Sequence, residues 1–326
     1  MAETTIYKFD DISIIVDTKS DKLHSYIEEF TFIKTTDNIF NKKISFSFIE
    51  DGSFVENCFK VPDDAAVEID VPFEMDEGIR FRGFTRGNTE IWYIYDGYGS
   101  VYINLGKKEI AANWHNEEDA IDIIGFILLF IHPLNKVLGE FGYIRLHAAC
   151  IKVNKKNIII TGISGRGKST ATFALLNSGY NVLSDEMPLI KKIDGGFNAY
   201  TLLNIIKLRQ HALDTFFMGF ERVFFRSGED CFIKLSDLNM ETLFCLQGIH
   251  QIFILEQTGK EETVIKPARP MEVIPELFPF TINVILEKQV ENVFQTVVDL
   301  IDSVNCYKIF FGTNMEEFSR QIEKVE

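Results

Sequence analysis

Residues 162–169 read Gly-Ile-Ser-Gly-Arg-Gly-Lys-Ser and match the pattern G-x-x-x-x-G-K-[ST] at every defined position. Glycines allow such a loop to fold so that its backbone N–H groups converge on phosphate oxygens. Lys168 would reach the β- and γ-phosphates of a nucleotide, and the Ser169 hydroxyl would complete the coordination of Mg²⁺. The alternative is a glycine turn that joins a strand to a helix and binds nothing. The residues that we expect to bind the nucleotide are Gly162, Ser164, Gly165, Arg166, Gly167, Lys168, Ser169 and Thr170.

Two adjacent acids, Asp185 and Glu186, follow the loop by about seventeen positions and end an apolar run. An acid at the end of a strand beside a phosphate loop can hold Mg²⁺ directly or through water. With two acids, one can serve the metal while the other accepts a proton from an attacking hydroxyl. The alternative is a solvated turn before Pro188. We therefore expect Mg²⁺ to be held by Ser169, Asp185 and Glu186.

One histidine stands close to this region of the sequence. His147 lies in the apolar run 143–153, about fifteen residues before the loop. A lone histidine in such a run is more often a packed core residue than a catalytic one. The other histidines form no spacing that suggests metal ligands.

The elements around the loop are those that a phosphate site needs. The apolar run 156–161 predicts a strand before the loop, 168–179 predicts a helix that ends at Gly179, and 180–185 predicts the next strand. The run 143–153 predicts a further strand. Beyond them the pattern predicts strands over 250–257 and 306–312, and helices over 284–303 and 314–325.

The first part of the chain has a different pattern. β-branched and aromatic runs separated by turn residues predict a small antiparallel, β-rich domain with strands at 12–17, 43–50, 90–97 and 100–106. Residues 117–140 have helical periodicity, interrupted by Pro133. We therefore divide the chain into a β-rich domain over 1–140, which would bind a substrate or partner, and a nucleotide-binding domain over 141–326.

Composition narrows the class of protein. The chain has 326 residues, 46% hydrophobic content and a net charge of −15, which argues against a general affinity for nucleic acid or for acidic membranes. The apolar run 123–131 is only about half as long as a bilayer-spanning helix. Five scattered cysteines without a C-x-x-C pair exclude a disulfide framework. With no signal peptide visible in 1–11, we expect a cytoplasmic protein.

The stretch 145–190 resembles the catalytic domain of the HPr kinase/phosphorylase family. That family shows a strand that begins Leu-His, a second strand, the loop Gly-x-Ser-Gly-x-Gly-Lys-Ser, a helix that ends near glycine, and an acidic pair. A weaker resemblance continues through 205–213, 231–238 and 306–312. The chain is most similar to the divergent branch found beside peptide-modification genes, which includes the kinases that phosphorylate lasso-peptide precursors.

This resemblance implies a fold like that of phosphoenolpyruvate carboxykinase, an α/β domain with a mixed sheet and a phosphate loop. It implies ATP as the nucleotide, Asp185 as the base that deprotonates the acceptor hydroxyl, and His147 near the phosphates or tuning that base. Glu186 would assist Mg²⁺ together with Ser169. Arg209 and Lys234 would stabilise the transferring phosphoryl group.

The sequence departs from the family in two places. The family's acidic pair is usually Asp-Asp, whereas the second acid here is Glu186. The signature stretch of true HPr kinases after the acidic pair is absent, and Asn204 stands where an acid is expected. These departures favour a divergent relative with another acceptor over a bifunctional regulator of sugar uptake.

Two functions of different classes follow from these features. The first is a kinase that uses ATP and Mg²⁺ to phosphorylate a hydroxyl, chiefly a serine of a peptide or protein, with a small hydroxylated metabolite as the other acceptor. The second is a nucleotide-binding regulatory or assembly module with little or no transfer. Phosphoenolpyruvate carboxykinase activity is a poor third option, because no cluster of metal-ligating His and Lys lies beside the acids. The sequence predicts no nucleic-acid or membrane partner and leaves a homo-oligomer open.

Overall fold

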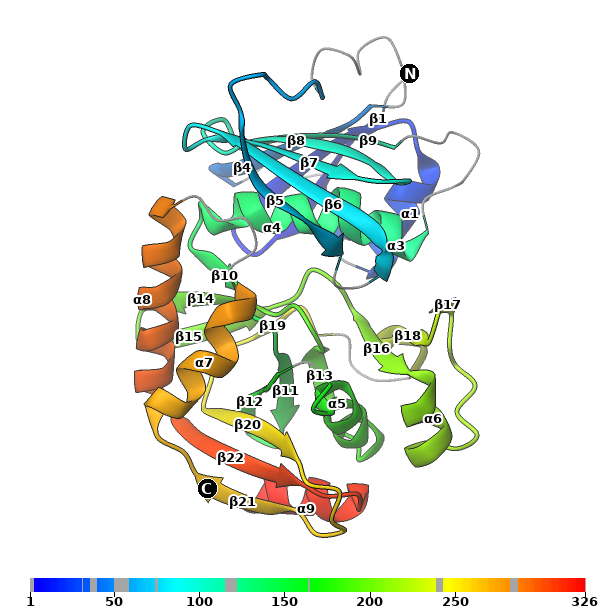
Figure 1. Cartoon of the computed structure of the whole chain (residues 1–326), viewed down its shortest axis with the longest axis vertical. Coiled ribbons are helices and arrows are strands. Elements are labelled where there is room, and N and C mark those ends of the chain that lie inside the picture. The colour runs from blue at the N-terminus through cyan, green and yellow to red at the C-terminus, as the bar shows by residue number, and fades with distance from the viewer. Residues whose placement is uncertain are drawn as a thin grey trace. The chain divides into compact units, whose positions relative to one another are not determined.

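The computed structural model describes residues 3–30, 32–35, 40–49, 59–73, 76–114, 122–163, 165–238, 243–281 and 287–325. The chain forms two compact units, Met1–Phe141 and Gly142–Glu326 (Figure 1), each with its own sheets and buried core. In the described parts of the chain, no helix combines the length and the apolar character needed to cross a membrane.

The first unit is built on a nine-stranded sheet in its described residues, with the strand order β3-β1-β2-β4-β9-β8-β7-β6-β5. The strands are β1 (Glu3–Phe9), β2 (Ile12–Thr18), β3 (Ile33–Lys34), β4 (Lys42–Phe48), β5 (Ala66–Phe73), β6 (Asp76–Arg86), β7 (Glu90–Tyr95), β8 (Gly99–Asn104) and β9 (Glu109–Trp114). Four of them, β2, β4, β7 and β8, lie where runs of β-branched and aromatic residues predicted strands. The pairings from β9 to β5 are antiparallel, as expected.

The expectation of a purely antiparallel sheet is wrong. β2 pairs in parallel with β4, and β4 pairs in parallel with β9. The chain reaches β4 from β2 through the helix α1 (Asp21–Phe30), and such a crossover brings the next strand back in the same direction. The sheet is therefore mixed.

A helical segment ends this unit and lies along β8 and β9 (Figure 1). It consists of α3 (Ile123–Phe126), the π-helical turn η1 (Ile127–Ile131) and α4 (His132–Gly139). The expected interruption at Pro133 is not a break, because the chain stays helical across it. Instead, the π-helical turn precedes the proline, and the His132 N–H donates to the Ile127 carbonyl five residues back. The first part of the predicted helix, 117–121, lies outside the described residues.

The second unit has a central six-stranded sheet, again mixed, in the order β13-β11-β12-β20-β22-β21. Its strands are β11 (Ala149–Val153), β12 (Lys156–Thr161), β13 (Asn181–Ser184), β20 (Gln251–Gln257), β21 (Val264–Pro267) and β22 (Asn305–Phe311). β12, β20 and β22 are parallel to one another, whereas β13, β11 and β12 are antiparallel. The mixed α/β class predicted from the sequence is confirmed.

Two smaller sheets complete the second unit, in the orders β10-β14-β15-β19 and β16-β18-β17. Their strands are β10 (Tyr143–Arg145), β14 (Leu189–Ile193), β15 (Gly196–Tyr200), β16 (Ile205–Arg209), β17 (Phe225–Ser227), β18 (Asp230–Lys234) and β19 (Cys245–Leu246). The single strand predicted over 143–153 is therefore broken. β10 pairs with β14 and β11 pairs with β12, so the chain changes sheets at 146–148, where His147 lies.

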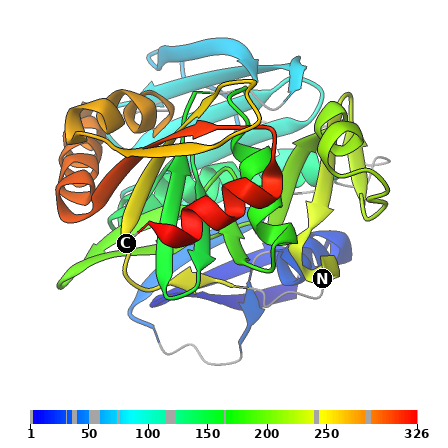
Figure 2. The ribbon, with the colours of Figure 1, turned by 90° about the horizontal axis from the view of Figure 1, so that it is seen from below.

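Helices cover both faces of the central sheet. They are α5 (Lys168–Asn177), α6 (Gln210–Phe216), α7 (Pro270–Thr281), α8 (Glu287–Ser303) and α9 (Met315–Lys324), with a 3₁₀ turn η2 (Leu235–Leu238). Side chains of β12 alternate between two cores: Ile158 and Ile160 pack with α5 and α9, and Ile159 packs with α7 and α8. Figure 2 shows α9 lying across the sheet beside α5. The sequence predicted α8 and α9 but not α7.

Candidate active site

The glycine-rich loop runs from the end of β12 to the start of α5, as the motif requires. Gly162 has φ +151°, and a Cβ at this position would stand 2.9 Å from the Leu255 carbonyl oxygen of the neighbouring β20. Gly167 has φ +88° and forms the N-cap of α5. Both conformations are ones that side chains rarely adopt, so the two glycines are needed for the loop to reach the helix. Ser164 lies outside the described residues.

Lys168 is the buried cation of this loop. Its Nζ donates a hydrogen bond of 2.8 Å to the Gly162 carbonyl oxygen, across the loop. Burial lowers the pKa of Lys168, and the carboxylates of Glu186, Asp185 and Glu276 act in the opposite direction. Ser169 and Thr170 follow on the first turn of α5 and are half-buried. A buried ammonium surrounded by several carboxylates marks this loop as a charged centre.

Asp185 lies directly after β13 and is only 1% exposed. Its Oδ2 accepts a long hydrogen bond of 3.4 Å from the Lys207 backbone N–H, and its Oδ1 has no hydrogen-bond partner among the described residues. Burial and the neighbouring Glu186 raise the pKa of Asp185 to about 7, although the nearby hydroxyls of Ser169 and Thr172 oppose the rise. The carboxyl group is thus able to take up a proton near neutral pH.

Glu186 is in the opposite electrostatic situation. Burial alone would raise its pKa, but Lys207, His147 and Lys168 together outweigh this effect and lower the pKa. Lys207 Nζ lies 3.4 Å from Glu186 Oε1 and 3.5 Å from Asp230 Oδ2, so it bridges the two carboxylates. Glu186 therefore stays ionised beside a neighbour that is readily protonated.

Lys207 was missed by the sequence reasoning, although a signal was present. In a strand, residues two apart share a face, and Lys207 and Arg209 are alternate residues of β16. The expected stabiliser Arg209 is exposed, at the end of β16 where α6 begins. The other, Lys234, lies opposite Ile205 in the β16–β18 ladder, with its Nζ 4.9 Å from the centre of the Phe224 ring. Both share the face of Lys207, but Lys207 is the cation that meets the acidic pair.

His147 is drawn into the same charged centre. Its pKa is lowered to about 4, first by burial and then by the ammonium of Lys168, while Glu186 acts in the opposite direction. The imidazole is consequently neutral at physiological pH. The structure thus brings together His147, Lys168, Asp185 and Glu186, four of the residues expected in the site.

A second unpredicted group comes from α7. Arg166, in the loop, lies with its Nη1 3.6 Å from Glu276 Oε1. The Thr161 hydroxyl, at the end of β12, donates to the Glu276 backbone carbonyl at 3.2 Å. The loop is therefore held against α7 just before its start, at Thr161, and within it, at Arg166.

The donor set fits a magnesium ion of the kind used in phosphoryl transfer. The described residues contain no group of three or more acids, histidines and cysteines able to hold a metal by themselves. Mg²⁺ in such sites takes one or two carboxylates, and phosphates and water supply the remaining ligands. The half-buried, ionised Glu186 and the Ser169 hydroxyl match this requirement.

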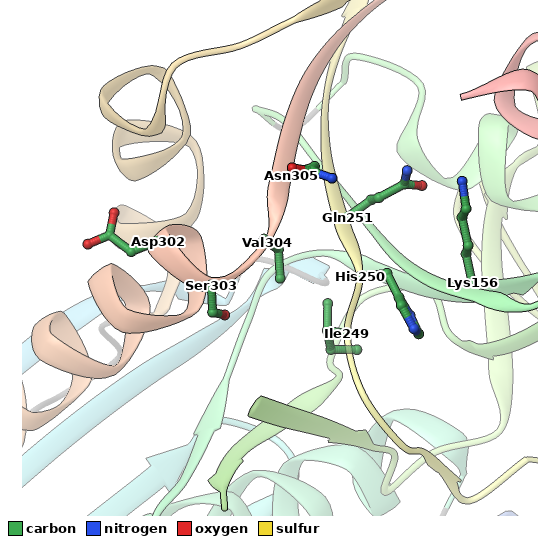
Figure 3. Close-up of a pocket in the computed structure, with 8 residues that line it drawn as sticks. All are labelled: Lys156, Ile249, His250, Gln251, Asp302, Ser303, Val304 and Asn305. Carbon is green, nitrogen blue, oxygen red and sulfur yellow. The ribbon is translucent and has the colours of Figure 1, made fainter. Parts of the chain in front are cut away.

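A hollow of about 390 Å³ lies at the other end of the central sheet, where β12, β20 and β22 begin. Figure 3 shows the side chains around it. Lys156, His250, Gln251 and Asp302 line it, but their side chains point in different directions rather than toward one point. The hollow is therefore separate from the glycine-rich loop, which lies where β12 ends.

No family model matches this chain, and no curated protein matches it significantly. In structure the chain is similar to the HPr(Ser) kinase/phosphatase from Coxiella burnetii, with 14% sequence identity and a TM-score of 0.32. The alignment covers 55% of this chain and 92% of that chain. A TM-score this low does not establish a common fold, so the function has to be argued from the residues of the site.

Proposed function

We propose that this protein is a kinase that transfers the γ-phosphoryl group of ATP to a hydroxyl acceptor. The observation that carries the proposal is the pair of carboxylates beside the glycine-rich loop. Asp185 is buried with one oxygen unpartnered, and Glu186 is held ionised by Lys207. Adjacent acids in such different environments can take the separate roles of proton acceptor and charge carrier.

In this reaction the loop amides and Lys168 bind the phosphates, for which Lys168 leaves the Gly162 carbonyl. The acceptor hydroxyl gives its proton to Asp185 as its oxygen forms a bond to the γ-phosphorus. The bond from that phosphorus to the β,γ-bridging oxygen breaks, and its electron pair leaves with ADP. Mg²⁺, held by Ser169 and Glu186, would neutralise charge on the β- and γ-phosphates.

Two neighbouring side chains support this chemistry. The ammonium of Lys207, fixed between Glu186 and Asp230, is a second cation beside the acidic pair, after Lys168, and would stabilise charge that develops on the transferred group. His147, neutral because its pKa is low, would hydrogen-bond near the phosphates without adding a charge.

We infer that the acceptor is a serine of a peptide or protein, since the region 145–190 resembles kinases with such acceptors. A small hydroxylated metabolite is the other class that the same chemistry can serve. Phosphoenolpyruvate-carboxykinase-like architecture belongs to this proposal as well, since the phosphate loop follows a strand of a mixed sheet.

The test uses γ-labelled ATP and Mg²⁺ with serine peptides, HPr and small hydroxylated metabolites as acceptors. We expect label on one acceptor class, no label with Asp185→Asn, and no nucleotide binding with Lys168→Met. Asp194→Asn, at an exposed turn between β14 and β15, is the matched control and should retain transfer. Tight ATP binding by the unaltered protein with no transfer to any acceptor would instead indicate a regulatory nucleotide-binding module.

A further inference from the structure

Glu276 places a negative charge beside a loop that is built to receive negative charge. It belongs to α7, about a hundred residues after the loop in the sequence, and its side chain is only 14% exposed. Its Oε1 faces Arg166 Nη1 at 3.6 Å, and its Oε2 is buried without a hydrogen-bond partner among the described residues. A carboxylate in this position opposes the binding of a triphosphate unless its charge is compensated.

Both cations of the loop are engaged with protein oxygens in this structure. Lys168 donates to the Gly162 carbonyl, and Arg166 pairs with Glu276. Glu276 also acts electrostatically on Lys168, raising the pKa that burial lowers. The same carboxylate therefore interacts with each of the two side chains that the loop offers to a phosphate.

The backbone of α7 makes this arrangement dependent on the position of the helix. The Glu276 carbonyl accepts the Thr161 hydroxyl, one residue before Gly162, so the carboxylate is anchored next to the start of the loop. On the same helix, Glu272 pairs with Arg269, just before the start of the helix. Glu276 is thus the acid of α7 that contacts the glycine-rich loop.

We propose that Glu276 is a positioning residue. Its carboxylate pairs with Arg166 as a phosphate would, and it releases Arg166 when the nucleotide binds. This inference rests on the proposed function, because it assumes that a nucleotide occupies the loop. Because a phosphate must replace Glu276 as the partner of Arg166, the loop binds anions more weakly than it would without Glu276. Only a ligand with enough negative charge to displace the carboxylate then gains the contact with Arg166. Triphosphates satisfy that requirement better than inorganic phosphate does.

The experiment compares Glu276→Gln with the unaltered full-length protein by calorimetric titration of MgATP, tripolyphosphate and inorganic phosphate. We expect Glu276→Gln to bind MgATP and tripolyphosphate about 3–10-fold more tightly, the range of one partly screened charge pair. The gain should appear in KM for MgATP more than in kcat, and Glu276→Asp should restore the weaker binding. Glu272→Gln, exposed on the same helix, is the matched control and should bind as the unaltered protein does.

A double-mutant cycle tests whether the effect passes through Arg166. In an Arg166→Gln background, Glu276→Gln should lose most of its gain. A full gain in that background, or no gain from Glu276→Gln alone, would overturn the exchange while leaving transfer and its loss in Asp185→Asn intact. If the unaltered protein and Glu276→Gln both fail to bind MgATP and tripolyphosphate, this inference and the proposed function are overturned together.

Discussion

At the scale of single residues, the site is defined by a difference between two adjacent acids. The backbone after β13 buries Asp185 and leaves Glu186 within reach of Lys207. Burial and the neighbouring Glu186 carboxylate raise the pKa of Asp185, whereas nearby cations, Lys207 first among them, lower the pKa of Glu186. This difference costs stability, because a buried carboxylate with an unpartnered oxygen is unfavourable in the folded state.

We therefore expect Asp185→Asn to stabilise the protein in the absence of nucleotide while it abolishes transfer. The folded-state pKa of about 7 lies above the ordinary value of 3.8, so the wild-type protein loses stability as pH rises from about 4 to 7. The variant should unfold with a free energy roughly 2 kcal/mol higher at pH 8 and with little difference near pH 4. Urea unfolding at several pH values measures this, with Asp194→Asn as control. If the free energy of unfolding of Asp185→Asn depended on pH in the same way as that of the wild-type protein, the prediction would be wrong.

His147 should produce the opposite pH dependence. Its pKa is lowered from 6.5 to about 4, so below about pH 6.5 the unfolded chain binds a proton that the folded protein resists. Stability then falls as pH decreases toward 4. Replacing His147 by Gln should remove about 1–2 kcal/mol of this loss, allowing for partial exposure. His211→Gln, at an exposed position on α6, should leave the loss of stability below about pH 6.5 unchanged. If both variants reduced this loss equally, the result would argue against a buried His147.

At the scale of elements, the site depends on β12, the glycine-rich loop and α5, and on the close approach of the loop to β20. Gly162 passes so near β20 that its missing Cβ is part of the packing. Gly179, after α5, also has a left-handed conformation, with φ +91°, but a Cβ added there would meet no atom within 4 Å. A side chain would therefore strain the backbone at both positions, but it would also clash with a neighbouring strand only at Gly162.

Gly162→Ala and Gly179→Ala should therefore differ more in their effect on nucleotide affinity than in the backbone strain they introduce. Gly179→Ala should cost about 1–2 kcal/mol of stability and leave nucleotide affinity unchanged. Gly162→Ala should cost about 2–3 kcal/mol and weaken MgATP binding at least about tenfold, because the loop must move away from Leu255. Thermal unfolding and calorimetric titration of both variants provide the comparison. Unchanged affinity in Gly162→Ala would show that the loop does not bind the phosphates as proposed.

At the scale of the whole molecule, two units with separate cores share one chain. The proposed phosphate site lies entirely within Gly142–Glu326. Its cations Lys168, Lys207 and Arg166 are each accompanied by carboxylates, in a protein of net charge −15. A ligand that binds only the folded second unit stabilises that unit by mass action.

MgATP at about one hundred times its Kd should stabilise the second unit by about 2.7 kcal/mol. Hydrogen exchange should show the added protection in β12 and α5, and not in β7 and β8 of the first unit. Lys168→Met should abolish the effect. Equal protection of both units by MgATP would show instead that they unfold as one.

The sequence by itself determined the parts of the site whose residues are close in the chain. The loop, the helix after it and the acidic pair at the end of the next strand all lie within about twenty-five residues, where local geometry decides. Four strands of the first unit, β2, β4, β7 and β8, were also predicted, from runs of β-branched and aromatic residues. Their partners were not, since the parallel pairing of β2 with β4 depends on how the chain crosses between them.

Only the tertiary structure decided which distant groups complete the site. Lys207 and Arg209 share one face of β16, and the contact of that strand with the two residues that follow β13 selects Lys207 as the partner of Glu186. Glu276 reaches Arg166 because α7 packs beside the end of β12. Contacts between residues this far apart depend on strand order and helix packing over the whole unit, and no local pattern of residues encodes them.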